Sequence, residues 1–245
     1  MENSIIFAIG FIASFFGSFT SSGASLLSFT FLGLYGLSPF TILGVIKVGS
    51  IGFNIGGLYN YARADKIVWK YVVIFTFIGS IGAYIGTAIV LNIDEALFSK
   101  IIGIAMLLCV PLTLLKPSLG VTSQPTGKKK RFLGYCMYAL TSVWGSSIVI
   151  GAGIMNMFSQ LYFFGLTILE VKGTAKIPNL VRTAITLALF IGAGIINWPL
   201  ALAFLGGAFF GSLVGTYYSV KVGDTWLRYI LLSTVLVVAL KLILF

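Results

Sequence analysis

Hydrophobic residues fill most of the chain in long runs that short polar stretches separate. Eight runs occur, at approximately 4–35, 38–62, 71–92, 96–115, 132–165, 168–193, 199–220 and 226–245. An α-helix needs about 20 mostly apolar residues to cross the hydrocarbon core of a bilayer. Six runs are close to that length, whereas the first and the fifth are longer, at about 32 and 34 residues. The pattern predicts an all-α polytopic membrane protein with about eight helical segments.

Both long runs contain a polar or glycine-rich stretch near the middle. The first reads GSFTSSGAS over residues 17–25, and the fifth reads WGSSIVIGAG over residues 144–153. Irregular backbone persists inside a membrane only where protein or a water-filled cavity surrounds it. We therefore expect each long run to be a broken helix, which either enters and returns or crosses twice as two short helices. The residues expected at the breaks are Ser21, Ser22, Gly23, Ser146, Ser147, Gly151 and Gly153.

A helix that begins at such a break has a functional interpretation. Its free N–H groups and the positive end of its dipole would face the centre of the bilayer, where they form a site for an anion. The alternative is structural, because small residues also allow helices to pack closely in membranes. The presence of a break in both long runs favours the anion site.

A polar linker, KPSLGVTSQPTGKKKR, divides the chain into two halves of similar length. We expect a first membrane repeat at 1–116, a basic cytoplasmic linker at 117–131 and a second membrane repeat at 132–245. One constant offset aligns Gly44 with Gly173, Lys47 with Lys176, Trp69 with Trp198, and Gly86 with Gly215; with a slip of one residue, Gly17 and Gly23 align with Gly145 and Gly151. This agreement indicates duplication, and duplicated halves that pack about a pseudo-two-fold axis are typical of transporters.

Lysine and arginine in short loops indicate how the halves are oriented, because such loops stay on the cytoplasmic side. Arg63, Lys66 and Lys70 follow the second run, whereas the matching loop GAGIINW has no cation. The loop NIDEALFSK is net acidic, whereas its counterpart after the seventh run is net basic. Because the charge bias changes sign between matched loops, the sequence predicts an inverted repeat with both termini outside and the linker inside.

Polar residues lie at helical spacing in the second and sixth runs. They are Lys47, Ser50 and Asn54 in the first half, and Lys176, Asn179 and Thr183 in the second, with Arg182 as a further cation. The spacing places each trio on one helix face. Cations inside a membrane are costly and usually face a cavity, so we expect these residues to bind or attract an anion. The alternative is that the lysines extend to the interface.

Composition and charge narrow the class of function. The chain is 58% hydrophobic and 9% charged, whereas soluble domains have about 25% charged residues. There is no histidine, and the six acids lie at or near the ends of the runs. This argues against proton pumps, carboxylate-dependent cation carriers and intramembrane hydrolases. The net charge of +10 is explained by basic residues in cytoplasmic loops and by their attraction to anionic lipid. The remaining class of function is transport of a small anion. We expect no enzymatic activity and no cofactor.

Several segments together resemble one known family. GFIASFFGSFTSSGASLLSF, LGLYGLSP, YNYARADKIVW and GSIGAYIGT in the first half, and WGSSIVIGAGIMNMFSQLYFFGLTILEVKGTAKIPNLV in the second, are similar to the TauE/SafE sulfite-exporter family. The resemblance covers essentially the whole chain, including its duplication. The family's usual GxGGG signature is replaced by SGAS at residues 22–25 and by GAG at residues 151–153.

The resemblance implies a transporter of sulfite, sulfonates or related organic anions in the cytoplasmic membrane. We expect export, because outward movement of a monoanion gains about 2.3 kcal/mol per 100 mV of inside-negative potential without a coupling ion. The expected partners are the anion and membrane lipids, and no nucleic acid; the sequence leaves the oligomeric state open. Two alternatives stay open: a transporter of another small anion or a coupled solute, and a structural membrane subunit without a transport path.

Overall fold

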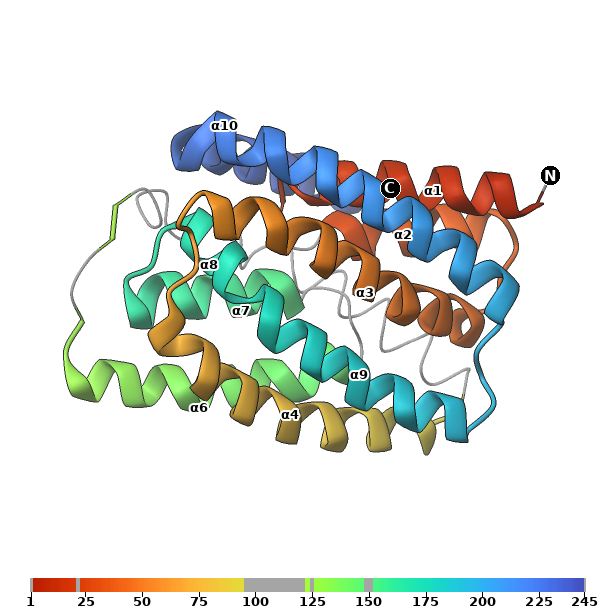
Figure 1. The fold of residues 1–245 in the computed structure, drawn as a ribbon, viewed down its shortest axis with the longest axis horizontal. Coiled ribbons are helices and arrows are strands. Elements are labelled where there is room, and N and C mark those ends of the chain that lie inside the picture. Colours follow the sequence, from red (N-terminus) through yellow and green to blue (C-terminus); the bar gives the residue numbers. More distant parts are fainter. Residues whose placement is uncertain (1, 21–22, 95–121, 124–125, 148–151, 245) are drawn as a thin grey trace.

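The computed structural model describes residues 2–20, 23–94, 122–123, 126–147 and 152–244 (Figure 1). Its elements are α1 (Glu2–Gly17), α2 (Gly23–Leu34), α3 (Pro39–Arg63), α4 (Trp69–Leu91), α6 (Lys128–Ser147), α7 (Ala152–Ser159), the short π-helix η1 (Gln160–Phe164), α8 (Ile168–Thr174), α9 (Lys176–Gly192) and α10 (Trp198–Leu244). These described residues contain no strand, so the all-α prediction is confirmed for them. The fourth apolar run, 96–115, lies outside the described residues.

Four of the described segments are long and apolar enough to cross a membrane. They are Pro39–Arg63, Trp69–Leu91, Ile168–Gly192 and Trp198–Leu227. The third combines α8 and α9, which meet at Ala175, three residues before Pro178. Large apolar side chains cover the outside of these helices, and Val73 and Phe77 of α4 are 74% and 69% exposed. Such a surface would be unfavourable in water over this extent and is typical of contact with lipid.

Both long apolar runs are broken helices, as predicted. α1 ends at Gly17 and α2 begins at Gly23, while α6 ends at Ser147 and α7 begins at Ala152. In Figure 1 the N-terminus and the connection from α2 to α3 lie at the same end of the molecule, on the right. The start of α6 and the connection from α7 to α8 lie together at the opposite end. Each broken segment therefore enters the molecule and returns to the end from which it came.

The backbone repeats its local features at the offset found in the sequence. Gly36 before α3 and Gly165 before α8 both have positive φ, at 92° and 67°, a conformation that glycine adopts without strain. Two residues later, Ser38 and Thr167 each accept a hydrogen bond through the side chain from the backbone N–H three residues on. These N-caps fix the starts of α3 and α8 at equivalent positions.

Equivalent helices run in opposite directions. Figure 1 shows α1, α3 and the first part of α10 running from right to left, and α4, α6 and α9 running from left to right. The contacts agree, because Ser50 of α3 meets Thr183 of α9, whereas Phe53, further along α3, meets Lys176, which is earlier in the chain. The counterparts at the offset are α1 and α6, α3 and α8–α9, and α4 and α10.

Glycines allow the closest helix contacts, and these contacts also occur in matched pairs. A Cβ on Gly86 of α4 would collide with the Val143 carbonyl of α6 and would make a tight contact with Ser146. A Cβ on Gly215 of α10 would collide with the Phe15 carbonyl of α1 and with Ser18 just beyond it. Small residues of this kind let helix backbones approach closely in membranes. The broken segments are therefore held against α4 and α10 by equivalent glycines.

The basic residues of the predicted linker begin a helix. α6 starts at Lys128, so Lys128–Arg131 form its first turn instead of an extended connection. Their position is at the end of the molecule opposite to the N-terminus (Figure 1). The boundary predicted near residue 116 lies outside the described residues.

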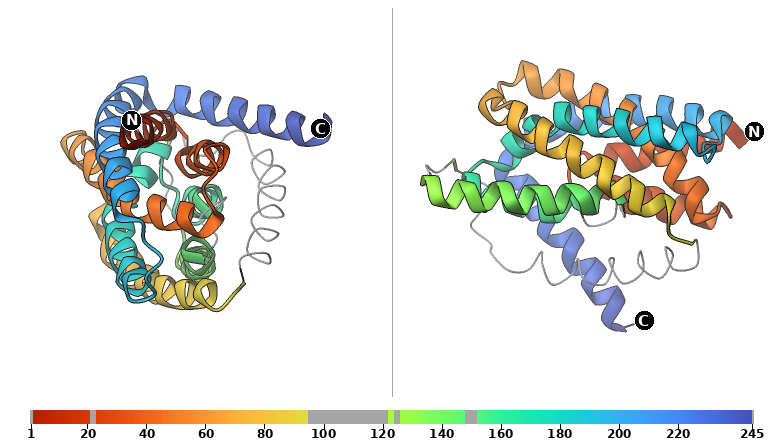
Figure 2. Two further views of the ribbon diagram at one scale, coloured as in Figure 1. Left: turned by 90° about the vertical axis from the view of Figure 1, so that its right-hand side faces the viewer. Right: turned by 90° about the horizontal axis from the view of Figure 1, so that it is seen from below.

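The last long helix contains a sharp bend. Gly223 has φ 80° and ψ 171° within α10, so the helix direction changes between the seventh and eighth apolar runs. Figure 2 shows the segment after this bend extending away from the first part of α10. The first part packs against α1 and α3.

Candidate functional site

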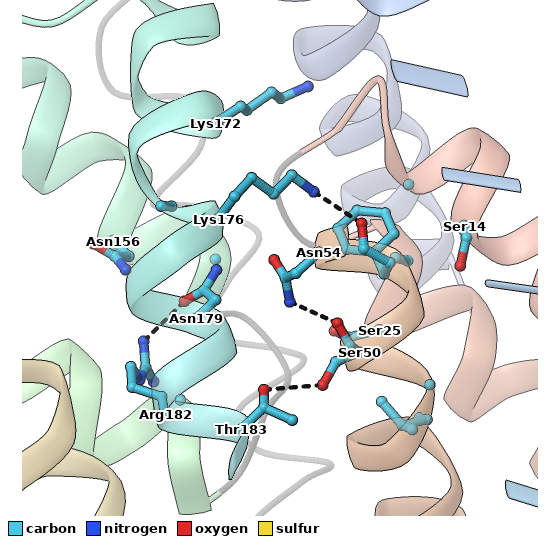
Figure 3. Close-up of a pocket in the computed structure, with 18 of the residues that line it drawn as sticks. Ser14, Ser25, Ser50, Asn54, Asn156, Lys172, Lys176, Asn179, Arg182 and Thr183 are labelled. Atoms are coloured by element: carbon cyan, nitrogen blue, oxygen red, sulfur yellow. Dashed lines mark hydrogen bonds between the residues drawn. The ribbon is translucent and has the colours of Figure 1, made fainter. Parts of the chain in front are cut away.

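A cavity of about 230 Å³ lies where the broken segments meet α3 and α9 (Figure 3). Its walls come from both halves of the chain. Nine of the residues predicted from the sequence line it: Lys47, Ser50, Asn54, Ser146, Gly153, Lys176, Asn179, Arg182 and Thr183. The two polar trios, far apart in the chain, therefore face one common space.

The other predicted site residues are placed differently. Gly23 begins α2 and donates its N–H to Thr20 Oγ1 at 2.9 Å, and Ser147 donates its hydroxyl to the Val143 and Trp144 carbonyls of its own helix. Neither is among the residues that line the cavity. Ser21, Ser22 and Gly151 lie outside the described residues. Of the free N–H groups expected at the start of this helix, that of Gly23 therefore already has a hydrogen-bond acceptor in Thr20.

Four cations line the cavity. They are Lys47, Lys172, Lys176 and Arg182, and no Asp or Glu is among the described residues that form its walls. Lys172 was missed at the level of the sequence, because its counterpart at the offset is the apolar Leu43. Its spacing of one helical turn from Lys176 was the available signal. Four cations without an acid in the described walls give the cavity a positive potential, which Asp224 near Lys172 offsets only in part.

Two of these lysines bind the ends of the broken helices in the opposite half. Lys47 Nζ donates to the Gly145 and Ser146 carbonyls at 3.4 and 3.3 Å, near the end of α6. Lys172 Nζ donates to the Ser18 carbonyl at 2.9 Å, just beyond the end of α1. The last carbonyls of a helix lack partners within the helix and attract cations. An ammonium has three donors, so further donors remain for a ligand.

Lys176 contacts an aromatic ring as well as the backbone. Its Nζ donates to the Phe53 carbonyl at 3.3 Å and lies 3.8 Å from the centre of the Phe53 ring. Lys176 is only 4% exposed and Lys47 only 8%. Both ammonium groups therefore lie inside the protein, which argues against extension of these lysines to the membrane interface.

Arg182 spans from α9 to α6. Its Nη1 donates to Asn179 Oδ1 at 3.4 Å, and its Nη2 donates to the Ser142 carbonyl and Ser146 Oγ at 3.1 and 3.2 Å. Its buried Nε donates to no described residue. The guanidinium has five N–H donors in a fixed plane, and such groups bind oxyanions well. Lys47 and Arg182 thus both contact Ser146, from α3 and α9 respectively.

Uncharged polar groups complete the walls of the cavity. Ser50 Oγ and Thr183 Oγ1 lie 3.1 Å apart, and Asn54 donates from Nδ2 to the Ser50 carbonyl at 2.7 Å. Sequence reasoning did not select further lining residues, namely Ser14, Ser18, Thr20, Ser25, Ser28, Thr141, Asn156 and Gln160. Asn156 and Gln160 are four residues apart on one helix face after the second break, which was a usable signal. No group of three or more His, Cys, Asp or Glu side chains suited to a metal occurs in the described part of the chain.

Comparison with known proteins finds relatives of the chain over nearly its whole length. A model of the family described as "Sulfite exporter TauE/SafE" matches residues 6–242. The chain is 23% identical to a "Probable membrane transporter protein" of Haemophilus influenzae, over 91% of this chain and 88% of that protein. It is 24% identical to the "Probable membrane transporter protein YfcA" of Escherichia coli K12, over 98% of this chain and 88% of that protein. No solved structure matches the chain significantly.

These two relatives are matched over 88% of their length, so the similarity extends over most of each protein and is not confined to one segment. Together with the apolar helices, it makes the chain an integral membrane protein of a transporter family. The chain belongs to the sulfite exporter TauE/SafE family.

Proposed function

We propose that the protein moves a small sulfur-containing anion, such as sulfite or a short sulfonate, out of the cell across the cytoplasmic membrane. The observation that carries this proposal is the cavity with Lys47, Lys172, Lys176 and Arg182 and no acid among its described walls. Cations in an enclosed site attract an anion more strongly than they would in water, because the local dielectric is lower. The lining hydroxyls and amides then satisfy the oxygens of the anion through hydrogen bonds.

Transport through this site uses the two halves as an inverted repeat. The opposite directions of α3 and α9 and the equivalent glycine contacts support this assignment. Both termini are placed outside and Lys128–Arg131 inside, because basic residues stay cytoplasmic. Transporters of this build alternate access by rocking one half against the other around a fixed site. The hydrogen bonds of Lys47 and Lys172 to the opposite half would change in such a motion.

The membrane potential supplies the driving force in this proposal. A monoanion that leaves an inside-negative cell gains about 2.3 kcal/mol per 100 mV. The cations that bind the anion stay with the protein, so net negative charge moves outward. Export then needs no coupled ion and should produce an electrical current.

Flux measurements in liposomes test the proposal. The purified protein should carry sulfite down its gradient without sodium or a pH gradient, and an imposed potential should change the rate. Arg182→Gln should strongly reduce the flux, whereas Lys70→Gln, an exposed cation outside the cavity, should leave it unchanged. No flux above that of empty liposomes for sulfite or any sulfonate would refute the proposed function. Flux of carboxylates alone would assign the same site to another class of anion.

A further inference from the structure

Two amide oxygens in the cavity accept no hydrogen bond from the described part of the chain. Asn54 is 3% exposed and Gln160 is 1% exposed, and both line the cavity. Asn54 Oδ1 and Gln160 Oε1 are fully buried and receive no donor from any residue that the structure describes. Buried acceptors are nearly always paired, because the loss of their hydration is otherwise uncompensated. These two oxygens therefore point to a partner that enters the cavity.

The orientation of the Asn54 amide is determined by its neighbour. Asn54 Nδ2 donates to the Ser50 carbonyl at 2.7 Å. A carbonyl can only accept, so a reversed amide would place two oxygens in contact. The oxygen of Asn54 must therefore face away from this carbonyl, into the space between α3 and α9 (Figure 3). In η1 of the second half, Gln160 Nε2 donates to Asn156 Oδ1 at 2.8 Å, and Gln160 Oε1 accepts no hydrogen bond from a described residue.

A ligand of this cavity must match two kinds of group. Arg182 and the lysines offer donors and positive charge, whereas Asn54 Oδ1 and Gln160 Oε1 offer only lone pairs. A fully deprotonated oxyanion has no donor, so it would satisfy the cations but would place oxygen against oxygen at the two amides. An anion with a hydroxyl or a retained proton would satisfy both kinds of group.

We infer that the substrate is a monoanion that also has a hydrogen-bond donor, and that Asn54 and Gln160 select for this donor. The inference rests on the proposed function, since it specifies the anion that the same cavity binds. It separates hydroxyalkyl sulfonates and the singly protonated form of sulfite from sulfate and simple alkyl sulfonates. A site built to receive a hydroxyl discriminates strongly against an analogue that lacks it, because its own polar groups then stay unpaired.

The experiment compares two sulfonates of equal charge and similar size. 2-Hydroxyethanesulfonate has a terminal hydroxyl where propane-1-sulfonate has a methyl group. Calorimetry on the purified protein should give a dissociation constant about tenfold lower for the hydroxyl compound, which is the usual value of one such buried hydrogen bond. Asn54→Leu and Gln160→Met remove the two acceptors with little change in volume. We expect the preference to disappear in the variant whose acceptor binds the hydroxyl.

Asn92→Leu is the matched control. Asn92 Nδ2 also donates to the carbonyl four residues earlier, at 2.8 Å, but Asn92 is exposed and outside the cavity. This variant should keep the wild-type preference. Two results would overturn the inference. One is equal binding of the two sulfonates by the wild-type protein, and the other is a preference for the hydroxyl compound that persists in both cavity variants. Neither result would contradict the proposed anion transport. If neither sulfonate binds and no anion flux occurs in liposomes, the proposed function itself fails.

Discussion

The hydroxyls of Ser50 and Thr183 lie 3.1 Å apart and join α3 of the first half to α9 of the second. The offset relates Ser50 to Asn179 and Thr183 to Asn54. The symmetry-related contact would therefore be between Asn54 and Asn179, which face each other in Figure 3. Asn54 Oδ1 accepts no hydrogen bond from a described residue. Of these two symmetry-related contacts, the Ser50–Thr183 hydrogen bond is formed, whereas Asn54 Oδ1 accepts no hydrogen bond from Asn179.

This asymmetry predicts that the two contacts alternate during transport. If the halves rock about the site, the Ser50–Thr183 contact should part when the equivalent asparagine contact forms. A disulfide between Ser50→Cys and Thr183→Cys should hold α3 and α9 in the present arrangement. We expect oxidation of this double variant to abolish flux and reduction to restore it, as measured in liposomes. The single variants under the same oxidant are the controls.

Full cross-linking with normal flux would contradict this prediction, because the two helices could then not separate at this point during the cycle. The chain has two native cysteines, Cys109 and Cys136, and both should be replaced by serine beforehand. These substitutions prevent a mixed disulfide from being mistaken for the intended cross-link.

Removal of one cavity charge should weaken anion binding. Lys176→Gln keeps much of the length and polarity but removes the ammonium, and a lost charge-assisted hydrogen bond costs roughly ten- to a hundredfold in affinity. Lys47→Gln should have a larger effect on turnover, because Lys47 also holds the end of α6 through Ser146. Calorimetry and flux assays separate these effects. Lys70→Gln is the control, and unchanged affinity in both cavity variants would remove the lysines from the site.

Helix contacts at glycine predict a clear order of stability. In Gly86→Ala the new methyl group would collide with the Val143 carbonyl of α6, and we expect a loss of about 1–3 kcal/mol from this overpacking. Gly192→Ala meets no atom within 4 Å, and alanine is favoured over glycine in helices by about 1 kcal/mol. Thermal unfolding in detergent should therefore place Gly86→Ala below and Gly192→Ala at or above the wild type. The reverse order would contradict the packing of α4 on α6.

The helices and their order follow from local sequence signals. α3 and α4 begin and end within a few residues of their apolar runs, because caps such as Ser38 act over short distances. The offset also identified Lys47 and Lys176, since a duplicated helix retains the spacing of its polar face. These features depend on neighbours in the sequence, so the sequence alone was sufficient to find them.

The contacts between residues of the site could not be predicted from local sequence signals. Lys47 binds carbonyls of residues 145 and 146, and Lys172 binds the carbonyl of residue 18. These pairs depend on how the broken segments return into the molecule, and a backbone carbonyl has no sequence signature. Gln160 lies in a π-helix that the apolar pattern does not indicate. The number of cations in the cavity was underestimated because Lys172 has no cation at the equivalent position of the first half, although it lies one helical turn from Lys176.

Orientation in the membrane gives the last prediction. Positive residues stay on the cytoplasmic side, and α6 presents Lys128–Arg131 at the end opposite to the N-terminus (Figure 1). In a variant without the native cysteines, Asn3→Cys should react with an impermeant thiol reagent added to intact cells. Thr126→Cys should react only after permeabilisation. Neutralisation of Lys128, Lys129 and Lys130 should reduce this difference, since each basic residue near anionic lipid contributes about 1 kcal/mol. Equal labelling of both sites in intact cells would place the two ends of the first half on one side and would exclude the inverted repeat.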